Sequence, residues 1–283
     1  SVRISGAKNS ALPAMAAALL TAGEVSLENV PMVNDIFTAR RLLRELGVSV
    51  EFDGGHGVLL RAEKIRSHEA PYDLVKTMRA SVLVLGPLLA RTRRARVSLP
   101  GGCAIGARPI NLHIKGLERL GARMRTEHGY VEASAARLSG AEVVFDKITV
   151  TGTENLIMAA ALANGTTVLQ NAACEPEVVD LAEMLNKMGA KIAGAGTPMV
   201  TIEGVSELKG TSHRIIPDRI EAGTFLVAGA ITNGEIEILE SNPGHLSSVI
   251  DKLRDTGVNI ETASGRMTVR GGELKAADVV TKE

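Results

Sequence analysis

Four stretches of the chain repeat one pattern of apolar and polar positions. In each stretch, apolar residues recur at helical spacing among charged residues, and a glycine ends the run before alternating residues begin. This pattern is typical of an amphipathic helix with a glycine C-cap, followed by a half-buried strand. The glycines follow one another at intervals of 74, 68 and 68 residues and are Gly47, Gly121, Gly189 and Gly257. The spacing predicts four copies of one structural unit.

A further helix, rich in small apolar residues, is predicted upstream of each of these stretches. Because it comes earlier along the chain, it is the first helix of its unit. Examples are NSALPAMAAALLTAG at 9–23 and TENLIMAAALANG at 153–165. Each unit is thus predicted to be a helix, a strand, a second helix and a pair of strands, which makes the fold α/β. A helix that is apolar all round belongs in a protein interior, so we expect the sheets to pack outside these helices.

Three such units can bury their first helices around a common axis. We therefore predict that residues 7–216 form a closed first domain of three units. Residues 1–6 together with 217–283 are predicted to form an incomplete second domain that holds the fourth unit. A repeat that cannot bury its own apolar face needs neighbours, so we expect the fourth unit to leave an apolar face uncovered. From the start at Ser1 and the end at Glu283 we expect a piece of a longer protein.

Composition limits the classes of partner. Among 283 residues, 32 are Lys or Arg and 32 are Asp or Glu, so no net charge directs the chain to nucleic acid or to a membrane surface. No apolar run approaches the roughly 20 residues that cross a bilayer. Aromatic residues make up 2%, which disfavours stacking on single-stranded nucleic acid. Because the first residues lack the apolar core of a signal peptide, we expect a cytoplasmic protein.

The cysteines, the histidines and one basic run are further candidates for local chemistry. The two cysteines, Cys103 and Cys174, fit a reducing compartment, and their spacing predicts neither a disulfide framework nor a zinc site. The six histidines also lack metal-ligand spacing, and we expect no metal or other cofactor. The basic run at 91–96 is predicted to be a solvated turn between a helix and a strand, rather than a polyanion site.

Polar or charged residues open all four of the small apolar helices. If the units are related by rotation, these starts can converge, and helix N-termini offer free backbone N–H groups to an anion. Lys8, Arg79 and Arg108 would add charge-assisted hydrogen bonds to a carboxylate or a phosphate. Each of these residues taken alone is better explained as part of a solvated helix cap. Together with the repeat, they favour one shared anion site.

The segment SLPGGCAIGARP, at 98–109, places a thiol among glycines. Gly101, Gly102 and Gly106 give access to unusual backbone angles and predict a mobile lid. The cationic Arg108, five residues from Cys103, would favour the thiolate and lower the pKa of the thiol. The residues alone leave a reactive thiol and an inert loop cysteine equally open. Cys174 lacks such a glycine setting and is predicted to be a structural cysteine.

Several of these stretches resemble the enolpyruvyl transferase family, and specifically its branch that acts on UDP-N-acetylglucosamine. The similarity extends from the first residue to about residue 271, and the glycine–cysteine loop distinguishes this branch from the sister enzymes that act on shikimate 3-phosphate. The matching segments are ISGAKNSALP at 4–13, APYDLVKTMRAS at 70–81, LPGGCAIGARPINLHIKGLERLGA at 99–122, GTENLIMAA at 152–160 and PDRIEAGTFLVAGA at 217–230.

The resemblance implies a fold and a reaction. The fold would be the inside-out α/β barrel of the family, with three units in each of two domains and the active site between the domains. The reaction would transfer the enolpyruvyl group of phosphoenolpyruvate to the 3'-hydroxyl of UDP-N-acetylglucosamine and release phosphate, as the first committed step of peptidoglycan synthesis. Both substrates are small molecules, and the oligomeric state is left open.

The resemblance also implies roles for individual residues. Lys8, Arg79 and Arg108 match ligands of phosphoenolpyruvate, with Lys8 and Arg108 also counted as catalytic, and Cys103 matches the proton donor that fosfomycin alkylates. Asn9 matches a residue that helps to hold the sugar nucleotide. The remaining nucleotide and sugar contacts would be Arg108, Pro109, Ile110, Asn111, Leu112, Lys147, Ile148, Thr149 and Val150.

The match also has gaps. The family pattern continues into two more units, which bring a catalytic aspartate and a further arginine, so we expect residues 1–283 alone to be inactive. Two other functions remain open: a UDP-sugar-binding module without turnover, and a related enolpyruvyl transferase with another acceptor.

Overall fold

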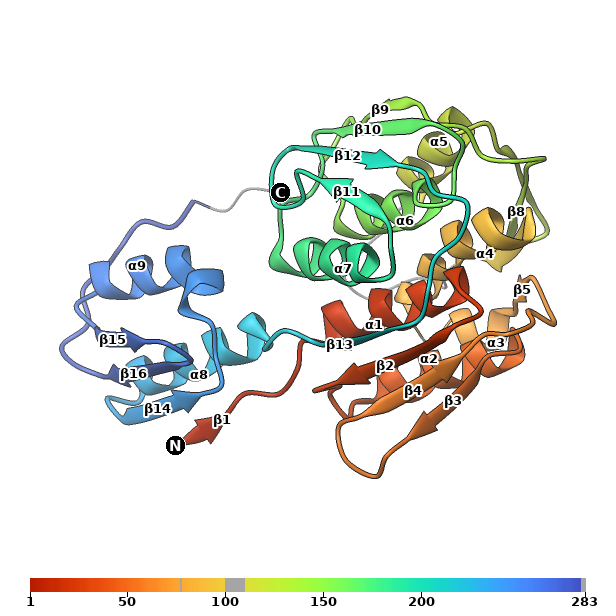
Figure 1. Ribbon diagram of the computed structural model, residues 1–283. Helices are drawn as coiled ribbons and strands as arrows, with labels where there is room; N and C mark the ends of the chain where they lie inside the picture. Colours follow the sequence, from red (N-terminus) through yellow and green to blue (C-terminus); the bar gives the residue numbers. More distant parts are fainter. Residues whose placement is uncertain (77, 100–109, 281–283) are drawn as a thin grey trace. The chain divides into compact units, whose positions relative to one another are not determined.

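The computed structural model describes residues 1–76, 78–99 and 110–280. The chain divides into two compact units, one formed by Ser1–Ala7 with Ile215–Glu283 and the other by Lys8–Arg214 (Figure 1). The chain therefore passes twice from one unit to the other. No helix in the described ranges is long and apolar enough to cross a membrane.

The larger unit contains three copies of the predicted repeat. The first copy comprises α1 (Lys8–Ala17), η1 (Ala18–Leu20), β2 (Glu24–Glu28), α2 (Asn34–Glu45), β3 (Ser49–Phe52) and β4 (Val58–Arg61). The second comprises β5 (Glu69–Ala70), α3 (Tyr72–Val75), η2 (Arg79–Val84), α4 (Leu85–Thr92), β6 (Arg94–Ser98), α5 (Asn111–Arg119), β7 (Arg123–Glu127) and β8 (Tyr130–Ser134). The third comprises β9 (Glu142–Val144), α6 (Val150–Ala160), β10 (Thr166–Gln170), α7 (Pro176–Lys187), β11 (Lys191–Ala193) and β12 (Met199–Glu203), and β13 (Thr211–Arg214) ends the unit.

Each copy builds a four-stranded sheet, one strand more than the sequence predicted. The strand orders are β13-β2-β4-β3, β5-β6-β8-β7 and β9-β10-β12-β11. In every sheet the additional strand lies at the edge, parallel to the strand that follows the first helix. These edge strands have two to four residues, too few to show the alternation by which a strand is recognised. The strand β13, at the end of the unit, pairs with β2 near its beginning and closes the ring of repeats.

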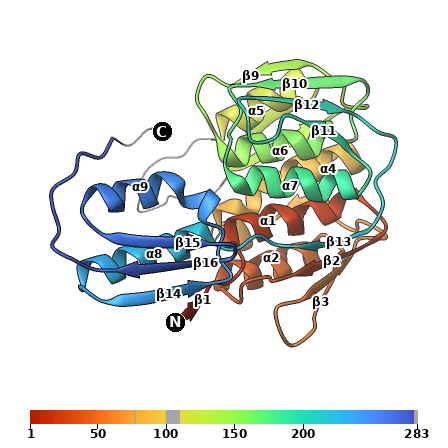
Figure 2. The same cartoon turned by 60° about the vertical axis from the view of Figure 1, so that its left-hand side comes forward.

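The small apolar helices form the interior, as predicted, and the sheets lie outside them (Figures 1 and 2). Eight of the ten residues of α1 and nine of the eleven residues of α6 are buried. At Gly86 on α4, an added Cβ would lie 2.3 Å from Oδ1 of Asn155 on α6, so no larger residue fits there. Small side chains thus let these helices approach closely, and the inner faces of the sheets complete the core.

The four glycines of the repeat end their helices in the same way. Their φ angles lie between 89° and 103°, in the left-handed region that favours glycine. In the first copy the Gly47 N–H donates to Arg44 O, and the Val48 N–H donates to Leu43 O. The same pair of hydrogen bonds occurs after Gly121, Gly189 and Gly257. All four turns are Schellman motifs, which explains why the glycines mark the repeat in the sequence.

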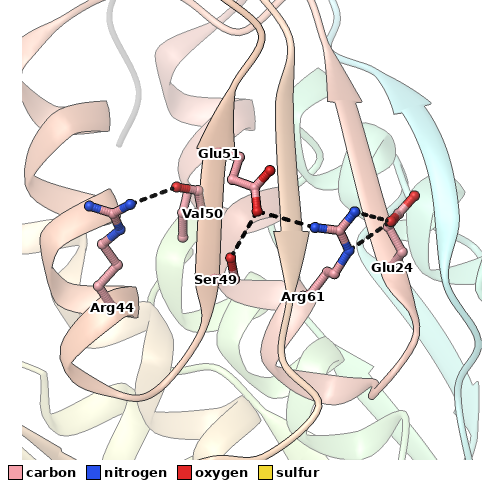
Figure 3. Close-up of polar contacts among 6 residues, drawn as sticks. All are labelled: Glu24, Arg44, Ser49, Val50, Glu51 and Arg61. Carbon is pink, nitrogen blue, oxygen red and sulfur yellow. Dashed lines mark hydrogen bonds and ion pairs between the residues drawn. The ribbon is translucent and has the colours of Figure 1, made fainter.

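Charged side chains cover the outer faces of the sheets. Arg61 on β4 bonds to Glu24 on β2 at 2.8 Å and to Glu51 on β3 at 3.2 Å, so one guanidinium spans three strands (Figure 3). Ser49 also donates to Glu51, and Arg44 donates to Val50 O at 3.4 Å. Because the ion pairs are exposed, each contributes at most about 1 kcal/mol. Their main effect is to keep this face polar.

The basic run at 91–96 differs from the predicted solvated turn. Arg96 lies on β6, where it pairs with Glu69 and Glu132 and stacks 3.8 Å from the ring centroid of Tyr130. Arg91 at the end of α4 is partly buried, and its guanidinium donates to backbone carbonyls. The prediction failed for these two arginines because partners far away in the sequence surround them.

A buried polar network fastens the closing strand. His213 on β13 lies 2.8 Å from Oδ1 of Asp180 on α7, and both side chains are 2% exposed. Ser10 on α1 donates to the other oxygen of the same carboxylate. Nζ of Lys187 lies 3.1 Å from Nδ1 of His213 and can only donate, so Nε2 of His213 carries the proton given to Asp180. The network joins the first helix, the last helix and the last strand of the unit.

The smaller unit contains the fourth copy. It comprises β1 (Val2–Arg3), α8 (Arg219–Ile231), β14 (Glu235–Leu239), η3 (Pro243–Leu246), α9 (Ser247–Asp255), β15 (Asn259–Ala263) and β16 (Arg266–Arg270). Its sheet has the order β1-β14-β16-β15, and β1 from the beginning of the chain takes the parallel edge position. On α8, Ile220, Val227 and Ile231 are 53%, 40% and 68% exposed. Apolar side chains of α8 are thus exposed, and the incomplete second domain stays a prediction.

We expect His213→Leu to lower the free energy of unfolding by about 2–4 kcal/mol, because it leaves the buried carboxylate of Asp180 without its imidazole partner. Urea denaturation followed by circular dichroism measures the change. The matched control is His68→Leu, since His68 is exposed between β4 and β5, and its effect should stay within about 0.5 kcal/mol. Equal effects of the two substitutions would show that the network does not fasten the strand.

Candidate functional site

The starts of three first helices line one cavity of about 500 Å³ in the larger unit. Lys8 and Asn9 open α1, Arg79 opens η2, and Val150 opens α6. The cavity is lined by Lys8, Asn9, Leu12, Asp35, Met78, Arg79, Ala80, Val82, Ile110, His113, Ile148, Thr149, Val150 and Thr151. The sequence predicted this convergence from the repeat. The start of the fourth helix, α8, belongs to the smaller unit.

Helix starts make this end of the interior electropositive. The first turn of a helix leaves backbone N–H groups without intrahelical partners, and the helix dipole adds a partial positive charge. Thr149 is the N-cap of α6, and its Oγ1 accepts a hydrogen bond from the Gly152 N–H at 3.2 Å. Because α1 and α6 both present such an end to the cavity, an anion there would interact favourably with backbone as well as side-chain donors.

The two described cations of the cavity have different surroundings. Nζ of Lys8 lies 2.9 Å from Oδ2 of Asp35, and both side chains are between one third and one half exposed. Asp35 lies in the first turn of α2, where its charge also suits the helix dipole. Arg79 is half-buried and lies close enough to His113 to act on the pKa of the imidazole. The ion pair with Asp35 orients Lys8 at the rim without removing it from solvent.

His113 forms the floor of the cavity. It lies on α5, is 3% exposed, and receives a hydrogen bond at Nδ1 from Nδ2 of Asn155 at 3.0 Å. The amide orientation of Asn155 follows from its other contacts, since Oδ1 accepts from the Gly86 N–H at 2.7 Å and Nδ2 donates to Val82 O at 3.0 Å. The proton of a neutral imidazole is then on Nε2, which lies 3.3 Å from Oγ1 of Thr151.

Burial keeps this histidine neutral. Desolvation, with a smaller contribution from the positive charge of Arg79, lowers the pKa of His113 from its ordinary value of 6.5 to about 4. At neutral pH the floor of the cavity therefore carries no charge of its own. The positive charge stays with Lys8, Arg79 and the helix starts.

The structure brings together about half of the residues that the sequence proposed for the site. Lys8, Asn9, Arg79, Ile110, Ile148, Thr149 and Val150 line the cavity. Asn111 is exposed at the start of α5, Lys147 is exposed beside Ile148, and Leu112 lines a separate cavity with Lys115 and Asp146. The other three proposed residues, Cys103, Arg108 and Pro109, lie outside the described residues.

Sequence reasoning missed three polar residues of the cavity: Asp35, His113 and Thr151. A sequence signal was available only for Asp35, which follows the short loop before α2 in the position of a first-turn carboxylate. His113 lies on the buried face of α5, and Thr151 follows an N-cap, so neither has a pattern that distinguishes it from an ordinary helical residue.

Cys174 was predicted to be a structural cysteine, and the burial usual for such a residue is not found. Its side chain is exposed in the loop between β10 and α7, with Sγ 3.6 Å from Ala172 O. Partial desolvation and the neighbouring Glu175 carboxylate raise the pKa of its thiol, which lowers the thiolate fraction at neutral pH. In the ranges that the structure describes, no group of three His, Cys, Asp or Glu residues is placed to hold a metal ion.

Comparison with known proteins decides the family. The family model for EPSP synthase (3-phosphoshikimate 1-carboxyvinyltransferase) matches residues 1–282. A UDP-N-acetylglucosamine 1-carboxyvinyltransferase of Solibacter usitatus is 61% identical over 98% of this chain and 67% of that protein. The chain belongs to the enolpyruvyl transferase family. Proteins of the same name from Acidobacterium capsulatum and Koribacter versatilis are 60% and 58% identical over the whole chain, which spans 66% of their length.

Solved structures of enolpyruvyl transferases confirm the predicted fold. The enolpyruvyl transferase NikO of Streptomyces tendae has a TM-score of 0.84 at 26% identity, and the match covers 95% of this chain and 65% of that one. An EPSP synthase from Acinetobacter baumannii, at 21% identity and a TM-score of 0.70, shares the fold over 95% of this chain and 62% of its own. The inside-out α/β architecture of repeated units is thus common to all three proteins.

We expect the imidazole of His113 to titrate near pH 4 in the folded protein, and NMR of the ring nitrogens should show the Nε2–H tautomer above that pH. Because the native pKa is depressed, the unfolded state binds more protons between pH 6.5 and 4. Stability should therefore fall by about 3 kcal/mol as the pH falls through this range. His113→Asn should remove this part of the pH dependence, whereas the exposed-site control His68→Asn should retain it. A ring that titrates near 6.5 would contradict the assignment.

Proposed function

We propose that the protein transfers the enolpyruvyl group of phosphoenolpyruvate to the 3'-hydroxyl of UDP-N-acetylglucosamine and releases phosphate. The observation that carries this proposal is the identity of 58–61%, over essentially the whole chain, with proteins named UDP-N-acetylglucosamine 1-carboxyvinyltransferase. The EPSP synthase match at 21% identity speaks for the fold alone, and so it does not favour shikimate 3-phosphate as acceptor.

The cavity offers suitable chemistry for phosphoenolpyruvate. This substrate carries a phosphate and a carboxylate, and Lys8 and Arg79 present two cations where the starts of α1 and α6 also point. In the proposal Arg108 adds a third cation. Holding both anionic groups of the substrate fixes the carbon that must accept a proton, which is a contribution of positioning and of electrostatic stabilisation.

Protonation of the substrate is assigned to Cys103. The thiol proton goes to the methylene carbon of phosphoenolpyruvate, and the adjacent carbon becomes oxocarbenium-like and accepts the 3'-oxygen of the sugar. Loss of phosphate, with return of a methyl proton to the Cys103 thiolate, then restores the carbon–carbon double bond, and the proton of the 3'-hydroxyl goes to the base that the resemblance assigns to a later repeat. The neutral state of His113 suits this step, because a further cation in the cavity would oppose the positive charge that develops on the substrate.

The sugar nucleotide is assigned to the polar rim of the same cavity. Asn9 and Thr149 offer hydrogen-bonding side chains there, and Ile148, 47% exposed, offers an apolar surface. The proposal extends this contact set to Pro109, Ile110, Asn111, Leu112, Lys147 and Val150. Asn111 and Leu112 lie at the start of α5, directly after Ile110, which lines the cavity.

Calorimetry should detect binding of UDP-N-acetylglucosamine to this chain and no binding of shikimate 3-phosphate. Asn9→Ala removes an exposed amide and should weaken the binding about fivefold, the effect of one hydrogen bond. Asn259→Ala removes an exposed amide on β15 in the smaller unit and should leave it unchanged. Tighter binding of shikimate 3-phosphate would make the acceptor assignment wrong.

We also propose that residues 1–283 alone do not turn over, because this chain spans 66% of the length of two relatives and the resemblance assigns the base to a later repeat. A phosphate-release assay with both substrates should give the rate of a blank without protein. Release that depends on both substrates and is lost in Cys103→Ser would show that this chain already holds a complete site.

A further inference from the structure

A second and larger cavity, of about 730 Å³, lies at the other ends of the same three helices. Leu20 ends η1 after α1, Arg91 lies in the last turn of α4, and Leu162 follows α6, and all three line this cavity. Each helix runs for about 12 residues between the two cavities, a length of about 18 Å. The candidate site and this cavity are therefore at opposite ends of one helical core, and the proposed reaction does not use the second cavity.

One arginine caps the end of the first inner helix. The Arg91 guanidinium donates to Leu19 O at 2.9 Å and to Thr21 O at 2.7 Å, which are carbonyls at the end of the first helix. It also donates to Ala62 O at 2.6 Å, in the loop after β4. Burial lowers the pKa of this guanidinium, but the group stays charged at neutral pH. Arg91 thus balances partial negative charge at the end of the first inner helix, and these donors are engaged.

Three further cations line the cavity and are not needed for that balance. Arg93, Arg137 and Lys209 are exposed, and none of them makes a side-chain hydrogen bond or ion pair to another residue that the structure describes. The lining contains a single carboxylate, Glu207. Like charges gathered around one hollow repel one another, so an anion of more than one charge would be bound there with a favourable electrostatic energy.

The backbone at Arg93 has a conformation that arginine seldom adopts. Arg93 has φ 65°, in the left-handed region, at the turn between α4 and β6. At the corresponding turns of the third and fourth repeats, the left-handed positions are held by Gly165 and Asn233, residue types that adopt this conformation readily. An arginine there costs stability that a glycine would not.

We propose that this cavity binds a phosphate chain, such as the polyphosphate group of a nucleotide or inorganic polyphosphate. Guanidinium groups match phosphate oxygens through paired N–H donors, and two arginines with one lysine suit a ligand with several anionic oxygens along its length. A single monovalent anion would leave two of the three cations without a partner. The volume of the cavity accommodates a chain of two or three phosphates.

The direct test is calorimetric titration of the 283-residue chain with inorganic tripolyphosphate. The variants are Arg93→Gly, Arg137→Ala and Lys209→Ala, and each should weaken binding about tenfold, the effect of one charge-assisted contact. Glycine is chosen at 93 because it favours the positive φ, so the fold is retained. Arg125→Ala removes an exposed cation of β7 that does not line the cavity, and it should change the affinity less than twofold.

Two further arms separate this cavity from the candidate active site and one ligand class from another. In Arg79→Ala the tripolyphosphate binding that depends on Arg93, Arg137 and Lys209 should remain, because Arg79 lines the cavity at the opposite helix ends. Citrate should bind more weakly than tripolyphosphate. ATP should bind if the phosphate chain can be that of a nucleotide. Binding that is lost in Arg79→Ala, that is unaffected by the three cavity variants, or that is matched by citrate would overturn the proposal.

Discussion

Close packing of three small apolar helices is the constraint on which the rest of the larger unit depends. Residues such as Ala11, Ala14 and Gly86 let the helices approach until backbone of one meets side chains of the next, as at Asn155. Such helices have no polar face, so they are stable only if every side is covered. The outer helices and the four-stranded sheets cover these sides. Each inner helix needs such a covering, so one outer helix and one sheet occur in every repeat.

The same arrangement aligns the electrostatics of the core. All three inner helices run from the cavity with Lys8 and Arg79 to the cavity with Arg91, so their partial charges accumulate at the two ends. At the starting end, that charge is available to an anionic substrate. At the other end, Arg91 donates hydrogen bonds to carbonyl groups at the end of the first inner helix. The common direction of the three helices thus creates a candidate site at their starts and favours cations at their ends.

Buried polar groups then make the packing specific. Asn155 bridges α6 to the backbone of η2 and α4 and to His113 on α5, using its amide oxygen and nitrogen on different neighbours. The network of Ser10, Asp180 and His213 does the same for the first helix, the last helix and the closing strand. An apolar core of alanines and leucines could slide in register, whereas each of these contacts is satisfied in one arrangement only.

The sequence by itself determined the local features: the four repeats, the type of each helix and strand pair, the glycine turns, and Lys8, Asn9 and Arg79 as residues at helix starts. These follow from periodicity and from a positive φ that only glycine adopts freely, and both are properties of a few neighbouring residues. Tertiary structure alone decided that Arg91 lies partly buried against distant carbonyls and that His113 is neutral. It also decided the parallel edge strands and the exposure of Cys174. Each of these depends on partners that are distant along the chain or on solvent exclusion, and no local pattern encodes them.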